Sequence, residues 1–113
     1  MHDIAIIGGG PGGLFAAADL ARRGFDVAVF EEHASAGQPA HCTGVLAAEA
    51  FDEFDIPREC ILNPLGTARF FGPSGSSFSY TTPETEAVVI DRPAFDRVLC
   101  DRAIEAGVRV HAD

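Results

Sequence analysis

The chain has 113 residues, of which 47% are hydrophobic and 22% are charged. This length is typical of one domain, and the hydrophobic fraction excludes a disordered tail. No apolar run approaches the roughly 20 residues that cross a bilayer, so we expect no membrane-spanning segment. Residues 1–7 show neither a basic start nor a long apolar run, which argues against a signal peptide and predicts a cytoplasmic protein.

Acidic residues dominate the charge. There are 17 Asp and Glu residues against 8 basic ones, which are all Arg, and the net charge is −9. Such a surface repels the phosphates of nucleic acids, so nucleic-acid binding is not expected. Two explanations of the composition stay open: a salt-rich cytoplasm, in which an acidic surface keeps a protein dissolved, and the codon bias of a GC-rich genome.

The three cysteines, Cys42, Cys60 and Cys100, lie far apart in the sequence. They form no CxxC pair, and no histidine stands at the spacing of a metal ligand. The pattern therefore predicts reduced thiols and neither a disulfide framework nor a zinc site.

The first elements predict a β-turn-α-β unit. Asp3–Ile7 is a short apolar run typical of a buried strand, and Gly8–Gly13 follows with five glycines in six positions. Leu14–Arg23 has apolar residues at helical spacing, and Gly24 suits the left-handed end of that helix. Asp26–Glu31 is a second buried strand, which should run parallel to the first.

The middle of the chain has weaker patterns. We expect an ordered loop over His33–Thr43, a short acidic helix over Val45–Phe54 and irregular structure over Asp55–Pro64. Gly66–Phe71 and Ser76–Thr82 alternate around a Gly-Pro-Ser-Gly turn, which predicts a hairpin with one face in the core.

The last elements are clearer. Ala87–Ile90 predicts a short strand, and Asp91 can cap a helix that has Pro93 in its first turn. The expected buried face of this helix comprises Phe95, Val98, Leu99 and Ala103. Gly107 should end the helix, and Val108–His111 predicts another buried strand.

The glycine motif Gly8-x-Gly10-x-x-Gly13 stands between a predicted strand and a predicted helix, the context that makes this motif informative. Gly8 permits a tight turn, Gly10 lets a pyrophosphate approach the backbone, and Gly13 lets the helix pack closely on the sheet. The helix N-terminus then directs its N–H groups at the phosphates. The motif predicts a dinucleotide site.

Glu31 ends the second strand 23 residues after Gly8 (31 − 8), close to the roughly 20 expected in dinucleotide-binding units. A carboxylate there accepts hydrogen bonds from the hydroxyls of the adenosine ribose and disfavours a 2′-phosphate. The spacing alone leaves FAD and NAD open, because both contain ADP.

Residues 3–31 resemble the FAD-binding start of the glutathione-reductase and hydroxybenzoate-hydroxylase superfamily. Three later segments resemble geranylgeranyl reductases: Glu31–Gly44, Ala68–Gly75 and the arginine-containing Val89–Asp96. The resemblance implies FAD as cofactor. It also implies an α/β fold, in which a Rossmann-like FAD-binding βαβ unit with a parallel sheet carries an inserted β-hairpin from a substrate domain.

The same resemblance implies roles for individual residues. It places the FAD pyrophosphate at the glycine turn, the ribose at Glu31, a loop beside the flavin ring and an arginine at the flavin's phosphate or ribityl chain. The residues for the turn, the loop and the arginine are, in that order, Gly8, Gly10, Pro11, Gly12 and Gly13; Cys42, Thr43 and Gly44; and Arg92. The alternatives are a small buried hydrophobe for Cys42 and an exposed helix-start residue for Arg92. His41 is either a proton donor or a solvated loop histidine.

We expect residues 1–65 to begin the FAD-binding domain, 66–87 to form the hairpin and 88–113 to continue the FAD-binding domain. About three main-sheet strands are predicted, where a doubly wound domain has about five or six. The chain is therefore expected to be the N-terminal part of a larger protein and to be inactive alone.

The resemblance implies a flavin-dependent oxidoreductase that reduces carbon–carbon double bonds of isoprenoid chains, with a lipid or other small-molecule substrate. Three alternatives stay open. They are an FAD-dependent aromatic monooxygenase of the same superfamily, a non-catalytic dinucleotide-binding module and an NAD-dependent dehydrogenase. An isoprenoid substrate would bring the larger protein to a membrane surface.

Overall fold

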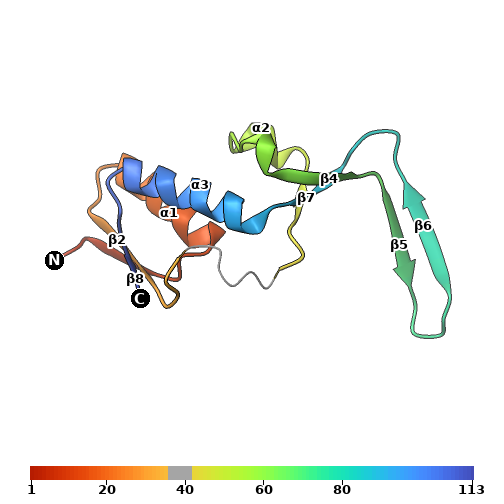
Figure 1. The fold of residues 1–113 in the computed structure, drawn as a ribbon, viewed down its shortest axis with the longest axis horizontal. Helices are drawn as coiled ribbons and strands as arrows, with labels where there is room; N and C mark the ends of the chain where they lie inside the picture. The colour runs from red at the N-terminus through yellow and green to blue at the C-terminus, as the bar shows by residue number, and fades with distance from the viewer. Residues whose placement is uncertain (36–41) are drawn as a thin grey trace. The chain divides into compact units, whose positions relative to one another are not determined.

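The structure is a computed structural model that describes residues 1–35 and 42–113 (Figure 1). Contacts within the chain divide it into two compact units. The first unit comprises Met1–His41 and Arg92–Asp113, and the second comprises Cys42–Asp91. Within the described residues, no helix combines the length and the apolar character needed to cross a bilayer.

A three-stranded parallel sheet forms the centre of the first unit. Its strands are β1 (Ile4–Ile7), β2 (Val27–Glu31) and β8 (Arg109–Ala112), in the order β1-β2-β8. β2 is the central strand and pairs with both neighbours. Ala28 lies opposite Ala5 of β1, and Val29 lies opposite Val110 of β8. The parallel pairing of β1 and β2 confirms the predicted β-turn-α-β unit.

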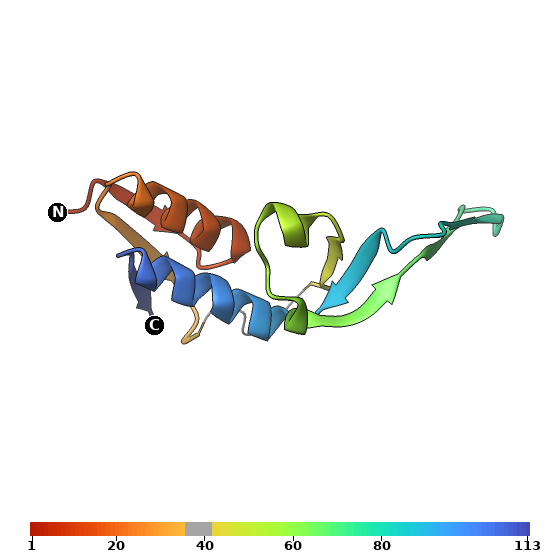
Figure 2. The ribbon, with the colours of Figure 1, turned by 90° about the horizontal axis from the view of Figure 1, so that it is seen from above.

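Two helices cover one face of this sheet. α1 (Pro11–Arg22) and α3 (Arg92–Glu105) lie side by side, and their N-terminal ends point the same way in both ribbon views (Figures 1 and 2). The two helices and β2 supply most of the buried apolar side chains of the unit, among them Leu14, Ala17, Val27, Val29, Leu99 and Ala103. This shared apolar layer holds the N-termini of both helices at the end of the sheet where the strands have their carboxyl ends.

The helix boundaries differ slightly from those predicted. α1 begins at Pro11 rather than Leu14, because proline fits the first helical turn. Gly24 and Gly107 have φ angles of +96° and +101°, so both helices end at the predicted left-handed glycines. On α3 the predicted residues Phe95, Leu99 and Ala103 are buried, whereas Val98 is only half-buried. Asp96, which was not predicted to be buried, is buried as well.

The second unit contains an antiparallel sheet that the sequence predicts only in part. β7 (Ala87–Ile90), which was expected, lies between β3 (Val45–Ala47) and β4 (Ile61–Leu65). A short helix α2 (Ala50–Glu53) and a 3-10 turn (Arg58–Cys60) connect these edge strands.

Two predictions were therefore wrong. The expected helix over Val45–Phe54 begins only at Ala50, because residues 45–47 pair with β7. The expected irregular segment over Asp55–Pro64 ends in a strand that also pairs with β7. Pro64 is tolerated there because β4 is an edge strand, where a missing N–H breaks no central ladder.

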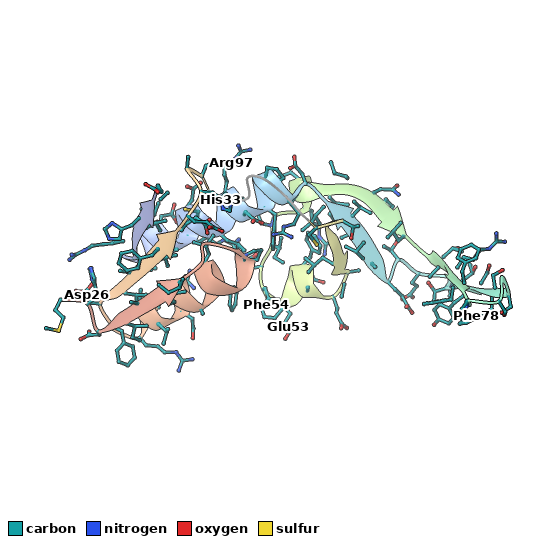
Figure 3. The ribbon with its side chains drawn as sticks, turned by 90° about the horizontal axis from the view of Figure 1, so that it is seen from below. Asp26, His33, Glu53, Phe54, Phe78 and Arg97 are labelled. Carbon is teal, nitrogen blue, oxygen red and sulfur yellow. The ribbon has the colours of Figure 1, made fainter. Side chains whose placement is uncertain are left out.

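The hairpin is confirmed as β5 (Thr67–Phe71) and β6 (Ser77–Thr81). Phe70 and Phe78 stack across its strands at a centroid distance of 4.8 Å, and Figure 3 labels Phe78 on it. All ten strand residues are exposed. The prediction that one hairpin face belongs to the core is wrong for this chain, since nothing within the described residues covers either face.

Candidate cofactor-binding site

The turn after β1 is tight because its glycines pack against one another. Gly8 has a φ angle of +103°, which side chains disfavour, and its N–H donates to the Phe30 carbonyl at 2.8 Å. A Cβ on Gly13 would collide with the Gly8 carbonyl oxygen and lie 3.3 Å from Ile6 Cγ2. Helix α1 therefore starts directly against the turn, as the close packing expected of Gly13 requires.

The two other glycines of the turn face open space. A Cβ on Gly10 or Gly12 would meet nothing within 4 Å. Gly10 is the N-cap of α1; no side chain caps this helix end, and its first turn holds no acidic residue. The first N–H groups of a helix have no partners within the helix, so this opening offers donors and positive potential to an anion. The open space at Gly10 and Gly12 and the uncapped helix start fit the pyrophosphate expected there.

The carboxylate of Glu31 reaches back from the end of β2 to the turn. Its Oε2 accepts the Gly9 N–H at 2.5 Å, and its Oε1 accepts the His33 N–H at 3.0 Å and lies 2.6 Å from His33 Nδ1. A Cβ on Gly9 would press on the Glu31 side chain at 3.1 Å. The Gly9 hydrogen bond first, and then the His33 contacts, hold the pKa of Glu31 below its usual range.

These contacts bear on the ribose role expected of Glu31. A carboxylate offers about four lone-pair sites, and three of them already have partners. A ribose diol therefore meets one vacant site and competes with the His33 imidazole for a second. The sequence analysis gave no role to His33, which Figure 3 labels. Its position two residues after Glu31 was the signal that could have indicated one.

A shallow hollow adjoins Glu31 at the same edge of the sheet. Ile7, Phe30 and His111 line it, and the Phe30 and His111 rings stack at a centroid distance of 4.9 Å. Both Ile7 and Phe30 are exposed, although they are apolar. The hollow thus places the stacked Phe30 and His111 rings beside acidic residues, because Glu31, Glu32 and Asp113 line it as well.

Arg92 stands at the start of α3 in the same unit. Its Nε donates to Asp96 Oδ1 at 3.0 Å and its Nη2 donates to Asp96 Oδ2 at 3.1 Å. The side chain of Arg92 is 20% exposed and that of Asp96 only 2%. Arg92 was expected either to contact the flavin or to be exposed at the helix start, and the ion pair with Asp96 was not predicted. The spacing of four residues on one helix was the signal that could have indicated it.

The remaining predicted site residues belong to the second unit. Cys42 and Thr43 are exposed and Gly44 is buried, with the Gly44 N–H 3.4 Å from Cys42 Sγ. The Gly44 carbonyl accepts the Ile90 N–H at 2.8 Å, which fixes this segment to β7. His41 lies outside the described residues.

Residues 3–69 match the family model of the FAD dependent oxidoreductases. The chain belongs to this FAD-dependent oxidoreductase family. Similarity to individual reductases extends over nearly the whole chain. The digeranylgeranylglycerophospholipid reductase of Methanoculleus marisnigri is 36% identical over 113 residues, which cover 96% of this chain and 28% of that protein. The geranylgeranyl diphosphate reductase of Rhodobacter capsulatus is 32% identical, over 94% of this chain and 26% of its own length.

A solved structure extends the comparison to the fold. The geranylgeranyl bacteriochlorophyll reductase-like protein of Thermoplasma acidophilum superposes with a TM-score of 0.84 at 30% identity, over 98% of this chain and 30% of that one. These findings confirm the expected resemblance, the Rossmann-like α/β fold and FAD as the cofactor of this oxidoreductase family. This member of the family spans less than a third of the length of these three relatives.

Proposed function

We propose that this chain is the FAD-binding portion of a reductase that saturates carbon–carbon double bonds of an isoprenoid lipid. One observation carries the proposal: similarity to proteins named as geranylgeranyl and digeranylgeranylglycerophospholipid reductases covers at least 94% of the chain. When bound and reduced, the flavin would supply the hydride for the double bond.

The first unit would hold the ADP half of the cofactor. The proposed pyrophosphate contacts are the backbone of Gly8, Gly10, Pro11, Gly12 and Gly13, supported by the open space at Gly10 and Gly12. Glu31 would bind the ribose, with the His33 imidazole giving way to one hydroxyl. The hollow that contains the stacked Phe30 and His111 rings would then take the adenine ring, which is attached to that ribose.

The remaining assignments are proposed from the resemblance. Cys42, Thr43 and Gly44 would lie beside the flavin ring, with Cys42 as a tentative catalytic group, and Arg92 would contact the flavin's phosphate or ribityl chain. Residues 1–65 and 88–113 are proposed as parts of the FAD-binding domain and 66–87 as a substrate-domain hairpin. We place the protein in the cytoplasm, in peripheral contact with a membrane that carries its lipid substrate.

The cofactor half of the proposal is tested by FAD binding to this chain. Gly10→Val should abolish FAD-dependent fluorescence changes, because its side chain would occupy the space proposed for the phosphates. Ala16→Val, on an exposed position of α1, is the matched control and should bind like the parent chain. FAD binding that survives Gly10→Val would contradict the site.

The reductase half is tested on the gene product that contains this chain. The FAD-loaded protein is reduced with dithionite and incubated without oxygen with digeranylgeranylglycerophospholipid, and the lipid is analysed by mass spectrometry. We expect a mass gain of two hydrogens for each double bond. An unchanged lipid, together with oxygen transfer to an aromatic compound in the presence of NAD(P)H, would favour the monooxygenase instead.

A further inference from the structure

The chain itself supplies most of the hydrogen bonds that the Glu31 carboxylate can accept. Oε1 accepts two from a single residue, one from the backbone N–H of His33 at 3.0 Å and one from its imidazole, whose Nδ1 lies at 2.6 Å. Oε2 accepts the Gly9 N–H at 2.5 Å. An ionised carboxylate only accepts hydrogen bonds, so Nδ1 of His33 carries the hydrogen. Both lone pairs of Oε1 are thus in use, and one of Oε2 is left.

The three donors differ in how easily Glu31 can exchange them. Two are backbone amides, and the Gly9 amide lies in the turn that the hydrogen bond from Gly8 to the Phe30 carbonyl closes. The imidazole needs only rotation about side-chain bonds to leave, and the His33 side chain is 41% exposed, so water replaces its lost partner. Exposed side chains change rotamer within about a nanosecond. Of these three donors, the imidazole is therefore the one that a ligand can displace without moving the backbone.

The ribose of adenosine has two neighbouring hydroxyls, and each can donate a hydrogen bond to a carboxylate. Glu31 offers one hydroxyl the remaining lone pair of Oε2, whereas the other hydroxyl has to replace the His33 imidazole. A ligand that uses both hydroxyls therefore loses part of its binding free energy to the broken imidazole contact. Its apparent affinity falls with the fraction of molecules in which the imidazole occupies Oε1.

We infer that His33 is a specificity-determining residue of the cofactor site, because its imidazole takes the place of a ribose hydroxyl on Glu31. The inference rests on the FAD site proposed above and adds to it a residue that competes with the cofactor. His33 lowers the affinity for nucleotides with a complete ribose and leaves the affinity for nucleotides without ribose hydroxyls unchanged. In exchange, the imidazole keeps a carboxylate that is only 13% exposed fully paired on Oε1 whenever no ribose is bound.

The test compares two nucleotides on the parent chain and on His33→Ala by isothermal titration calorimetry. ADP has both ribose hydroxyls, and 2′,3′-dideoxy-ADP has neither. His33→Ala should bind ADP about three- to tenfold more tightly, because both hydroxyls then find an unoccupied lone pair on Glu31. The affinity for dideoxy-ADP should not change, since this nucleotide does not compete with the imidazole. FAD contains the same adenosine and should gain the same factor as ADP.

The measured quantity is the ratio of the dissociation constants of dideoxy-ADP and ADP, in which changes of structure or of adenine contacts cancel. If His33→Ala does not fold, His33→Phe carries the test, because it keeps a ring without a donor and should raise the ratio by the same factor. The matched control is Ser35→Ala, at an exposed position of the same segment, which should leave the ratio unchanged. A ratio that stays the same or falls in a folded His33 variant overturns the inference.

These outcomes are distinguishable from failure of the FAD site. A parent chain that binds FAD and loses it in Gly10→Val keeps the pyrophosphate site, whatever the His33 variants do. Equal affinity for ADP and dideoxy-ADP in the parent chain and in every variant overturns the ribose role of Glu31 and, with it, the role of His33. A parent chain that binds neither FAD nor ADP overturns the whole site.

Discussion

At the scale of single residues, the carboxylate of Glu31 joins the end of one strand to the glycine turn of another. Its side chain is only 13% exposed, and its hydrogen bonds come from two backbone amides and one imidazole. Hydrogen bonds to an ionised carboxylate are roughly twice as strong as those between neutral groups. Glu31 therefore stabilises the turn before any cofactor is present.

This arrangement predicts an acid-sensitive contribution to folding. A carboxyl whose folded pKa is lowered stabilises the protein above its unfolded pKa, and the contribution is lost as the pH falls through the folded value. The free energy of unfolding should thus decline below about pH 4.5, the region where an unfolded glutamate begins to titrate. Glu31→Gln should be less stable near neutral pH and should lose less stability on acidification.

Urea denaturation of the two chains between about pH 6 and about pH 3 checks this expectation. Asp26 also has a lowered pKa, through its hydrogen bond with His2, so the difference between the chains is the relevant quantity. Glu32→Gln, at the exposed neighbouring position, is the control. Parallel pH profiles for Glu31→Gln and the parent would show that the Glu31 contacts contribute nothing to folding.

At the scale of elements, the first turn of α1 contains one glycine in a crowded position, Gly13, and one in an open position, Gly12. Gly13→Ala should destabilise the chain by about 1–3 kcal/mol, because its Cβ meets the Gly8 carbonyl and Ile6. Gly12→Ala should leave the free energy of unfolding unchanged or raise it by up to about 1 kcal/mol, because open space surrounds it and alanine favours the helix. Denaturant titrations of both variants measure the contrast; equal losses would show that packing at the turn is not the cause.

The elements that the sequence predicts well are those with local signals. β1, α1 and β2 have apolar periodicity and glycine boundaries, and they lie where the pattern places them. Val45–Ala47 and Ile61–Leu65 have no such signal, since their extended form depends on pairing with β7, which is distant in sequence. Pairing of this kind overrides local propensity.

Some residues of the candidate site could likewise be predicted from local sequence signals, and others could not. The glycine motif and Glu31 follow from spacing, because a dinucleotide requires those residue types at those positions. His33 and Asp96 were missed because their importance lies in side-chain contacts and burial. An aspartate in a helix is expected to be exposed, and only the packing of α3 shows that Asp96 is not.

At the scale of the whole molecule, the net charge of −9 sets the response to salt. If the acidic composition reflects a salt-rich cytoplasm, molar KCl should raise the melting temperature by screening the repulsion between carboxylates. Thermal melts at low and at molar KCl measure this. A melting temperature that does not rise with salt would leave genomic codon bias as the explanation.

The hydrogen bond from Gly9 to Glu31 has a kinetic consequence. A turn that already has its binding conformation needs no slow rearrangement before a ligand enters. The conformational entropy of the turn is lost during folding and not when the ligand binds. In stopped-flow mixing, the observed rate of FAD association should then rise linearly with FAD concentration, without a plateau. Glu31→Ala removes this hydrogen bond. The turn would then have to adopt its binding conformation before FAD enters, and the observed rate should reach a plateau.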